Sequence, residues 1–242
     1  MPPQRTPRQG TQDDREFSGA LARLKAAGGA LLVVGDFPRD LYSDVCYRML
    51  GYHGSQRRYR LFVSTDAEHP PASTCAHSPS SGPRGPQTQV VQYTTAQRNV
   101  DTSHQRLREG RPTTVVDGDL GDLGRTISGT IDHVTDQRTL EPAELRLCFD
   151  SLGPLLDHHD TDEVFRFLHL LVGRLKAVDG MGHFHLPRSP GTETVLRMQA
   201  LFDIVVELRL REHQLEQRWH LLKADLTTAW LPVETQLPAD DD

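Results

Sequence analysis

The sequence predicts an α/β fold with a mostly parallel sheet, flanked by helices and ending in a C-terminal antiparallel β-hairpin. Continuous apolar runs such as 30–34 are typical of strands buried on both faces, as in the middle of a parallel sheet. Segments with apolar residues at helical spacing separate these runs. Two last runs, 203–210 and 215–222, flank Glu212-His213-Gln214 and indicate a hairpin at the sheet edge.

The other elements follow in order along the chain. Helices are expected at 13–27, 41–50, 120–134, 161–178 and 193–201. The remaining strands are expected at 59–64, 89–93, 113–116, 145–149 and 182–186. Together they predict a single domain over 13–233, interrupted by a flexible loop rich in Pro, Ser and Gly at about 68–88. The polar segment 1–12 and the acidic segment 234–242 are expected to be disordered tails.

The composition narrows the class of protein. A chain of 242 residues suits one large domain, and a net charge of -6 gives no general attraction for nucleic acid. No apolar run is long enough to span a membrane, and the first residues lack the apolar core of a secretory signal. We therefore expect a cytoplasmic protein with no membrane partner and no strong signal for nucleic acid, whose binding would need a local basic patch.

Cysteine and lysine are both scarce. The three cysteines, Cys46, Cys75 and Cys148, form no Cys-x-x-Cys pair and no disulfide framework. Cys148 lies inside an apolar run, so we expect a small buried apolar side chain there. Of the 27 basic residues only three are lysine, namely Lys25, Lys176 and Lys223. Few lysines are therefore available to bind phosphate.

The first strand ends in a loop that has the layout of a phosphate-binding loop without its residues. Gly35 follows the strand, and a helix is predicted shortly after it. A working P-loop, G-x-x-x-x-G-K-[ST], needs a second glycine so that the backbone wraps the phosphates, and a lysine to meet their charge. Arg39 and Asp40 occupy that part of the loop instead. The positive charge of Arg39 could attract a phosphate, but the adjacent carboxylate of Asp40 would offset that charge. We therefore favour a structural strand-to-helix turn.

A later strand, 145–149, ends at Asp150-Ser151 and has the form of a Walker B strand. In P-loop ATPases such an aspartate holds the Mg²⁺ that bridges the phosphates. The alternative is that the Asp150 carboxylate caps the following turn. Asp66 and Glu68 follow another strand, where a carboxylate could orient water if a triphosphate were bound. Without a bound triphosphate, Asp66 and Glu68 are expected to be solvated loop residues.

Histidines suggest a separate possibility. His183 and His185 alternate on one predicted strand and therefore point to the same face. Together with His158 or His159, near the Asp150 loop, they could form a metal site. Histidines on a buried strand more often form hydrogen bonds within the core, so no metal ligand is assigned firmly.

Several sequence blocks resemble one known family. The segment from Cys148 to Leu156 resembles the apolar strand and Asp-Ser-Leu turn of KaiC-like proteins. Further blocks are similar to a family of haloarchaeal RecA-superfamily proteins that is KaiC-like or gas-vesicle-regulator-like and has no known function. These blocks are Gly29–Gly35, Arg60–Asp66, Val115–Leu120, Val164–Leu171, Gly182–Leu186, Leu201–Val206 and Arg218–His220. The resemblance covers residues 20–230 outside the loop, and lysine scarcity fits a salt-loving source.

The resemblance implies a RecA/KaiC-like core and a cytoplasmic setting. KaiC relatives that hydrolyse ATP bind it through a complete P-loop and form rings. Because this chain has a degenerate loop, ATP hydrolysis does not carry over to it. Only Asp150 matches a position of the Mg²⁺ site.

Three hypotheses follow. The first is a non-catalytic RecA/KaiC-like module that regulates or signals through contacts with a protein partner or with its own copies, and needs no cofactor. The second is a divergent ATPase, in which Asp150 holds Mg²⁺ and Asp66 or Glu68 orients water. Arg39 or an arginine of a neighbouring subunit would then meet the phosphates of ATP. The third is a metal-binding module that uses His183, His185 and either His158 or His159.

Overall fold

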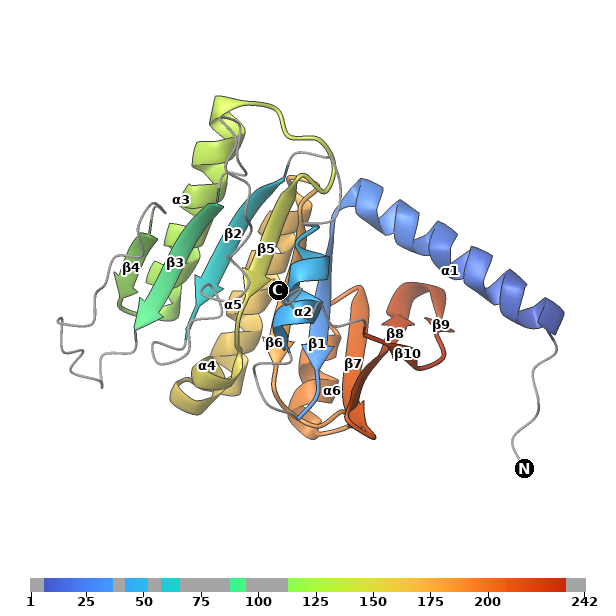
Figure 1. Ribbon diagram of the computed structural model, residues 1–242. Helices are drawn as coiled ribbons and strands as arrows, with labels where there is room; N and C mark the ends of the chain where they lie inside the picture. Colours follow the sequence, from blue (N-terminus) through green and yellow to red (C-terminus); the bar gives the residue numbers. More distant parts are fainter. Residues whose placement is uncertain (1–6, 37–41, 52–57, 66–87, 95–112, 234–242) are drawn as a thin grey trace, which may run out of the picture.

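A sheet of ten strands forms the centre of the computed structural model, with helices on both of its faces (Figure 1). The structure describes residues 7–36, 42–51, 58–65, 88–94 and 113–233. The strands are β1 Gly29–Val34, β2 Tyr59–Ser64, β3 Thr88–Thr94, β4 Thr113–Asp117, β5 Leu145–Phe149, β6 Met181–Leu186, β7 Ile204–Arg211, β8 Gln214–Leu221, β9 Leu226–Thr227 and β10 Leu231–Pro232. The helices are α1 Pro7–Ala27, α2 Tyr42–Met49, α3 Leu120–Gln137, α4 Gly153–His158, α5 Thr161–Lys176, α6 Glu193–Gln199 and a 3₁₀ turn, Leu222–Ala224.

The strand order is β10-β8-β7-β1-β6-β5-β2-β3-β4, and β9 pairs with β8. All strands from β7 to β4 in this order are parallel, whereas β8 runs antiparallel to β7, β9 and β10. The predicted α/β fold, with its mostly parallel sheet and C-terminal hairpin, is therefore confirmed. The strands that precede Gly35 and Asp150 lie on either side of β6.

Alternate residues of β1 bury against different helices. Leu32 and Val34 belong to an apolar cluster with α3, α4, α5 and α6, whereas Leu31 and Val33 belong to a cluster with α1 and α2. All four side chains are at most 4% exposed. This burial on both faces explains the continuous apolar run in the sequence. Figure 1 shows the same division, with α2 in front of the sheet and α5 behind it.

Some boundaries differ from the expectation. Helix α1 begins at Pro7 rather than at 13, so 7–12 of the predicted disordered tail is helical. Helix α4 and the two-residue strands β9 and β10 were not predicted, because such short elements carry no apolar periodicity. Most of the predicted loop at 68–88 and the tail at 234–242 lie outside the described residues.

The hairpin of β7 and β8 turns through two residues, Glu212 and His213, because Gln214 already pairs with Arg211 in the ladder. Both turn residues have a positive φ, 50° and 66°. This is the backbone of a type I′ turn, whose twist matches that of the strands it joins. Two-residue turns of this kind usually contain Asn or Gly, so Glu212 and His213 do not signal this turn type in the sequence.

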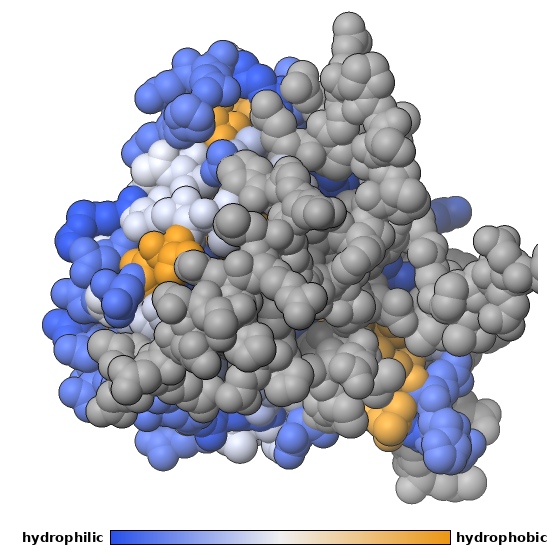
Figure 2. Space-filling view, turned by 60° about the vertical axis from the view of Figure 1, so that its left-hand side comes forward, coloured by the Kyte–Doolittle hydropathy of each residue, from blue (hydrophilic) through white to orange (hydrophobic). Residues whose placement is uncertain are grey.

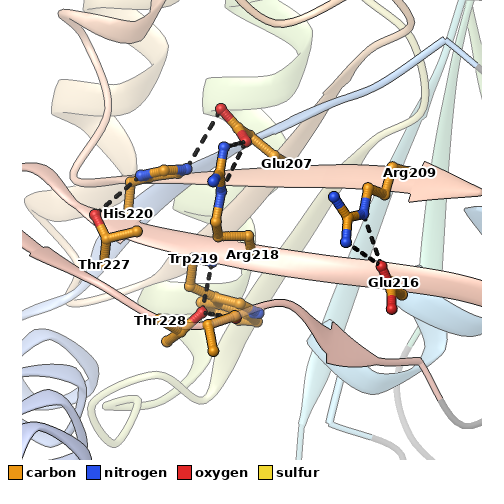
Figure 3. Close-up of polar contacts among 9 residues, drawn as sticks. Glu207, Arg209, Glu216, Arg218, Trp219, His220, Thr227 and Thr228 are labelled. Carbon is orange, nitrogen blue, oxygen red and sulfur yellow. Dashed lines mark hydrogen bonds and ion pairs between the residues drawn. The ribbon is translucent and has the colours of Figure 1, made fainter. Parts of the chain in front are cut away.

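Cross-strand ion pairs cover one face of this hairpin (Figure 3). Arg218 bonds to Glu207, which lies directly opposite, and Arg209 Nε donates to Glu216 at 2.7 Å. The Trp230 ring stacks on both guanidiniums, 3.9 Å from that of Arg209 and 4.6 Å from that of Arg218. Opposite charges on facing residues stabilise a strand pair and keep a sheet edge hydrated.

The described helices include none with the length and apolar character needed to cross a bilayer. Figure 2 views the side on which β4 and α3 come forward. Its coloured surface is mostly hydrophilic, and the apolar areas are small and separate. Single exposed apolar side chains, such as Leu170 at 72%, are ordinary on a protein surface.

Candidate functional site

The carboxyl ends of β1, β6 and β5 meet at one edge of the sheet. The chain leaves β1 toward α2 on one face, and leaves β6 toward α6 on the other. Ligands of open α/β sheets bind where neighbouring connections diverge in this way. This edge is therefore the expected position of a ligand-binding site.

Asp150 lies at this edge, directly after β5, and is 9% exposed. Its Oδ2 accepts a hydrogen bond from Ser64 Oγ at 3.0 Å. Its Oδ1 accepts from the Thr65 backbone N–H at 3.0 Å and from Thr65 Oγ1 at 3.1 Å. Both carboxylate oxygens are thus engaged by the end of β2. The arrangement fixes the ends of two neighbouring strands.

Ser151 organises the turn that follows. Its Oγ accepts a hydrogen bond from the backbone N–H of Gly153 at 3.2 Å, at the start of α4. Its carbonyl accepts from Thr65 Oγ1 at 2.7 Å. The side chain is buried, with 1% exposed. The Asp-Ser pair therefore has a local structural task whether or not a ligand binds nearby.

Gly35 closes β1 onto the segment after β6, because its N–H donates to the carbonyl of Arg188 at 3.1 Å. Its φ of 155° is positive, a backbone conformation that residues other than glycine rarely adopt. The other predicted residues of this edge, Arg39, Asp66 and Glu68, lie outside the described residues.

His183 and His185 lie on the face of β6 that packs against α2, with ring centroids 5.1 Å apart. Both are buried, at 3% and 4% exposed. His158 and His159 have other contacts. His158 Nδ1 lies 2.8 Å from the Pro154 carbonyl, and His159 Nε2 lies 3.1 Å from the Tyr93 hydroxyl. The structure therefore does not bring His158 or His159 together with His183 and His185.

Two cysteines stand beside His183 and His185 instead. Cys46, from α2, has its Sγ 3.1 Å from His183 Nε2 and 3.2 Å from Cys148 Sγ. Cys148, on β5, is the direct neighbour of His183 in the parallel ladder. One ligand atom from each of the four residues lies within 4.8 Å of the others. The sequence did not indicate this group, because its members come from three separate elements.

Several positively charged side chains lie close to this Cys-His group. A cavity of about 260 Å³ is lined by Lys25, Arg48, Arg58, Arg146 and His183, among others. Burial and the charges of Arg58 and Arg60 lower the pKa of Arg146 to about 10. Burial, His185 and Arg146 hold the pKa of His183 well below its usual value. The imidazole of His183 is therefore neutral at physiological pH.

Residues 28–208 match the family of unknown function DUF7504. No curated protein matches the chain. The match covers most of the sheet and the helices on both faces, including Gly35, Asp150 and the Cys-His group. The chain therefore belongs to this family.

Proposed function

We propose that this member of the DUF7504 family is a non-catalytic RecA/KaiC-like module that regulates or signals through protein contacts. One observation carries the proposal: both oxygens of the Asp150 carboxylate already accept hydrogen bonds, Oδ2 from Ser64 Oγ and Oδ1 from the Thr65 backbone N–H. A metal ion at Asp150 would have to compete with these donors. Strand β1 also has no phosphate loop at its end, since Asp40 and Leu41 stand where the spacing from Gly35 puts the glycine and lysine of a working loop.

The lysines support the same proposal. Lys176 and Lys223 both bind Asp203, which precedes β7 at the amino edge of the parallel strands. Lys25 lies at the end of α1, just before β1, and lines the cavity beside Arg146. All three are therefore remote from the carboxyl edge, where a nucleotide phosphate would need a cation.

The wider setting is part of the proposal. RecA/KaiC-like ancestry rests on the resemblance of the sequence blocks, together with the connections after β1 and β6 that leave toward opposite faces of the sheet. A haloarchaeal source rests on the use of 24 arginines and three lysines. We propose a cytoplasmic location, and contacts with a protein partner or with copies of the same chain.

A nucleotide titration tests the non-catalytic assignment. Thermal unfolding with ATP, GTP or cyclic nucleotides plus Mg²⁺, in high salt, should show no shift in Tm. A ligand at 100 times its Kd would add about 2.7 kcal/mol of stability, which is easily detected. ATP binding at micromolar strength that disappears in Asp150→Asn would support the divergent ATPase with Asp66 or Glu68, and would overturn the proposal.

The Asp150→Asn variant also tests the structural role of this carboxylate. The asparagine side chain replaces one carboxylate oxygen with an NH₂ group. This hydrogen-bond donor would then face the donor groups of Ser64 or Thr65. We expect a loss of about 1–3 kcal/mol in the free energy of unfolding, measured by urea denaturation. Asp157→Asn is a matched control, because this exposed carboxylate forms a surface ion pair with Arg188, and such pairs contribute little to stability. Equal stability of the two variants would contradict the role.

A further inference from the structure

We propose that Cys46, Cys148, His183 and His185 bind a divalent metal ion of the zinc class in a buried tetrahedral site. The inference does not depend on the proposed function. It starts from the convergence of four ligand atoms, two sulfurs and two imidazole nitrogens, within 4.8 Å of one another. All four side chains are at most 4% exposed.

The distances fit a metal centre. Zinc–sulfur bonds of about 2.3 Å at the tetrahedral angle separate two sulfurs by about 3.8 Å. The Sγ atoms of Cys46 and Cys148 are 3.2 Å apart, and Cys46 Sγ is 3.1 Å from His183 Nε2. Loading therefore requires Cys46 Sγ to move away from these two atoms by about half an ångström. Cys46 is on a helix that packs against the sheet, so a small shift of α2 provides this movement.

The ligand chemistry selects the class of metal. Two thiolates and two neutral imidazoles form a set of the kind that binds zinc in structural sites. On binding, the two thiols release their protons, and the two thiolates then balance the charge of the divalent ion. The burial of this site favours such a neutral product, because a net charge in an apolar interior is costly.

The surroundings show why the group is unusual for a core. Leu50 and Phe62 pack with the two cysteines in one apolar cluster and are at most 2% exposed. Two thiols and two imidazoles stand together amid these apolar neighbours, and each of the four groups is a metal ligand of the kind that zinc prefers.

The site would fix α2 to the sheet. Cys46 comes from α2, Cys148 from β5, and the two histidines from β6. The backbone of His185 also accepts a hydrogen bond from Leu152 N at 2.7 Å, in the turn after Asp150. Metal binding would thus join the helix that follows the degenerate loop to the strands that carry the Asp-Ser turn.

Metal analysis of protein purified without a polyhistidine tag, from zinc-supplemented cells, tests the site. We expect about one zinc per chain, as in structural zinc sites. Cobalt substitution should give thiolate-to-cobalt charge transfer and the strong visible bands of tetrahedral cobalt. Cys148→Ser and His183→Asn should each lose the metal and the spectrum. Cys75→Ser and His133→Asn, a surface histidine of α3 that contacts Gln137, should keep both.

A second measurement uses the wild-type chain, so its result does not depend on whether the variants fold. Removal of the metal from the wild-type chain with a chelator should lower Tm by several degrees, and added zinc should restore it. Three results would overturn the proposal. These are a metal-free wild type that takes up neither zinc nor cobalt after reduction, a metal content unchanged in Cys148→Ser and His183→Asn, and octahedral cobalt without charge transfer. A chain with a Cys46–Cys148 disulfide that takes up no metal after reduction is a case of the first result. It would show that the two cysteines form a redox pair instead of a metal site.

Discussion

Lys176 Nζ, at the end of α5, lies 2.8 Å from the Oδ2 of Asp203, at the start of β7. Lys223 approaches the other oxygen of the same carboxylate at 2.9 Å, and the backbone N–H of Ala30 donates to Oδ2 at 3.0 Å. Asp203 is 4% exposed. Two of the three lysines in the chain therefore stabilise one buried carboxylate that joins the beginnings of β1 and β7.

This carboxylate should make stability depend on acid pH. Burial alone would raise the pKa of Asp203, but hydrogen bonds from Lys176, Ala30 and Lys223 outweigh it and hold the pKa below its usual 3.8. A depressed pKa in the folded state stabilises the fold fully above the unfolded value. The stabilisation is lost as pH falls through the folded value. Stability should therefore drop below about pH 4, more in the wild type than in Asp203→Asn.

Asp203→Asn should also cost about 1–3 kcal/mol at neutral pH, because the two ammonium groups lose their charged acceptor. Urea denaturation at a series of pH values measures both effects. Asp136→Asn removes an exposed carboxylate of α3 and should change the free energy of unfolding by less than about 0.5 kcal/mol. Parallel pH profiles of wild type and Asp203→Asn would refute this account.

Gly182 is required by close packing between β6 and α5. A Cβ at this position would lie 2.6 Å from Leu175 Cδ2 and 3.1 Å from Phe184 Cε2. Leu175 is fully buried and has little room to move. Gly182→Ala should therefore lower the free energy of unfolding by about 1–3 kcal/mol, as overpacking does.

Gly173 is the matched control for Gly182. It lies within α5, where an added Cβ would have nothing within 4 Å. Alanine is a better helix former than glycine, so Gly173→Ala should raise stability by about 0.5–1 kcal/mol. Thermal unfolding of the two variants should therefore move in opposite directions. A gain in Tm for Gly182→Ala would show that the packing is looser than these distances imply.

The hairpin turn offers a stabilising substitution. His213 has a φ of 66°, which costs free energy for a residue with a side chain. His213→Gly should raise the free energy of unfolding by about 0.5–1 kcal/mol, because glycine is favoured in type I′ turns. Arg211→Gly, one position inside β7, should lower it, since an extended strand gains nothing from glycine. Circular dichroism melts would distinguish the two, and a loss for His213→Gly would reject the argument.

Local patterns were sufficient for most of the fold. The run Leu145-Arg-Leu-Cys-Phe149 predicted the bounds of β5, because all its side chains except that of Arg146 are apolar, as burial on both faces of a sheet favours. Helix α1 was predicted to begin too late, since its first turns, from Pro7, have no apolar spacing to detect. The two-residue turn at Glu212 escaped prediction because its backbone conformation is imposed by the twist of the paired strands.

For the candidate sites, the sequence by itself determined which residues end each strand. It identified Asp150-Ser151, the degenerate loop after Gly35, and the alternation that puts His183 and His185 on one face. Only the tertiary structure decided what these residues meet. Ser64 and Thr65 engage Asp150 because β2 lies next to β5, and Cys46 and Cys148 join the histidines because α2 packs over β5 and β6. Spacing along the chain carries no record of such contacts, since sheet order and helix packing bring together residues that are 86 and 137 positions apart.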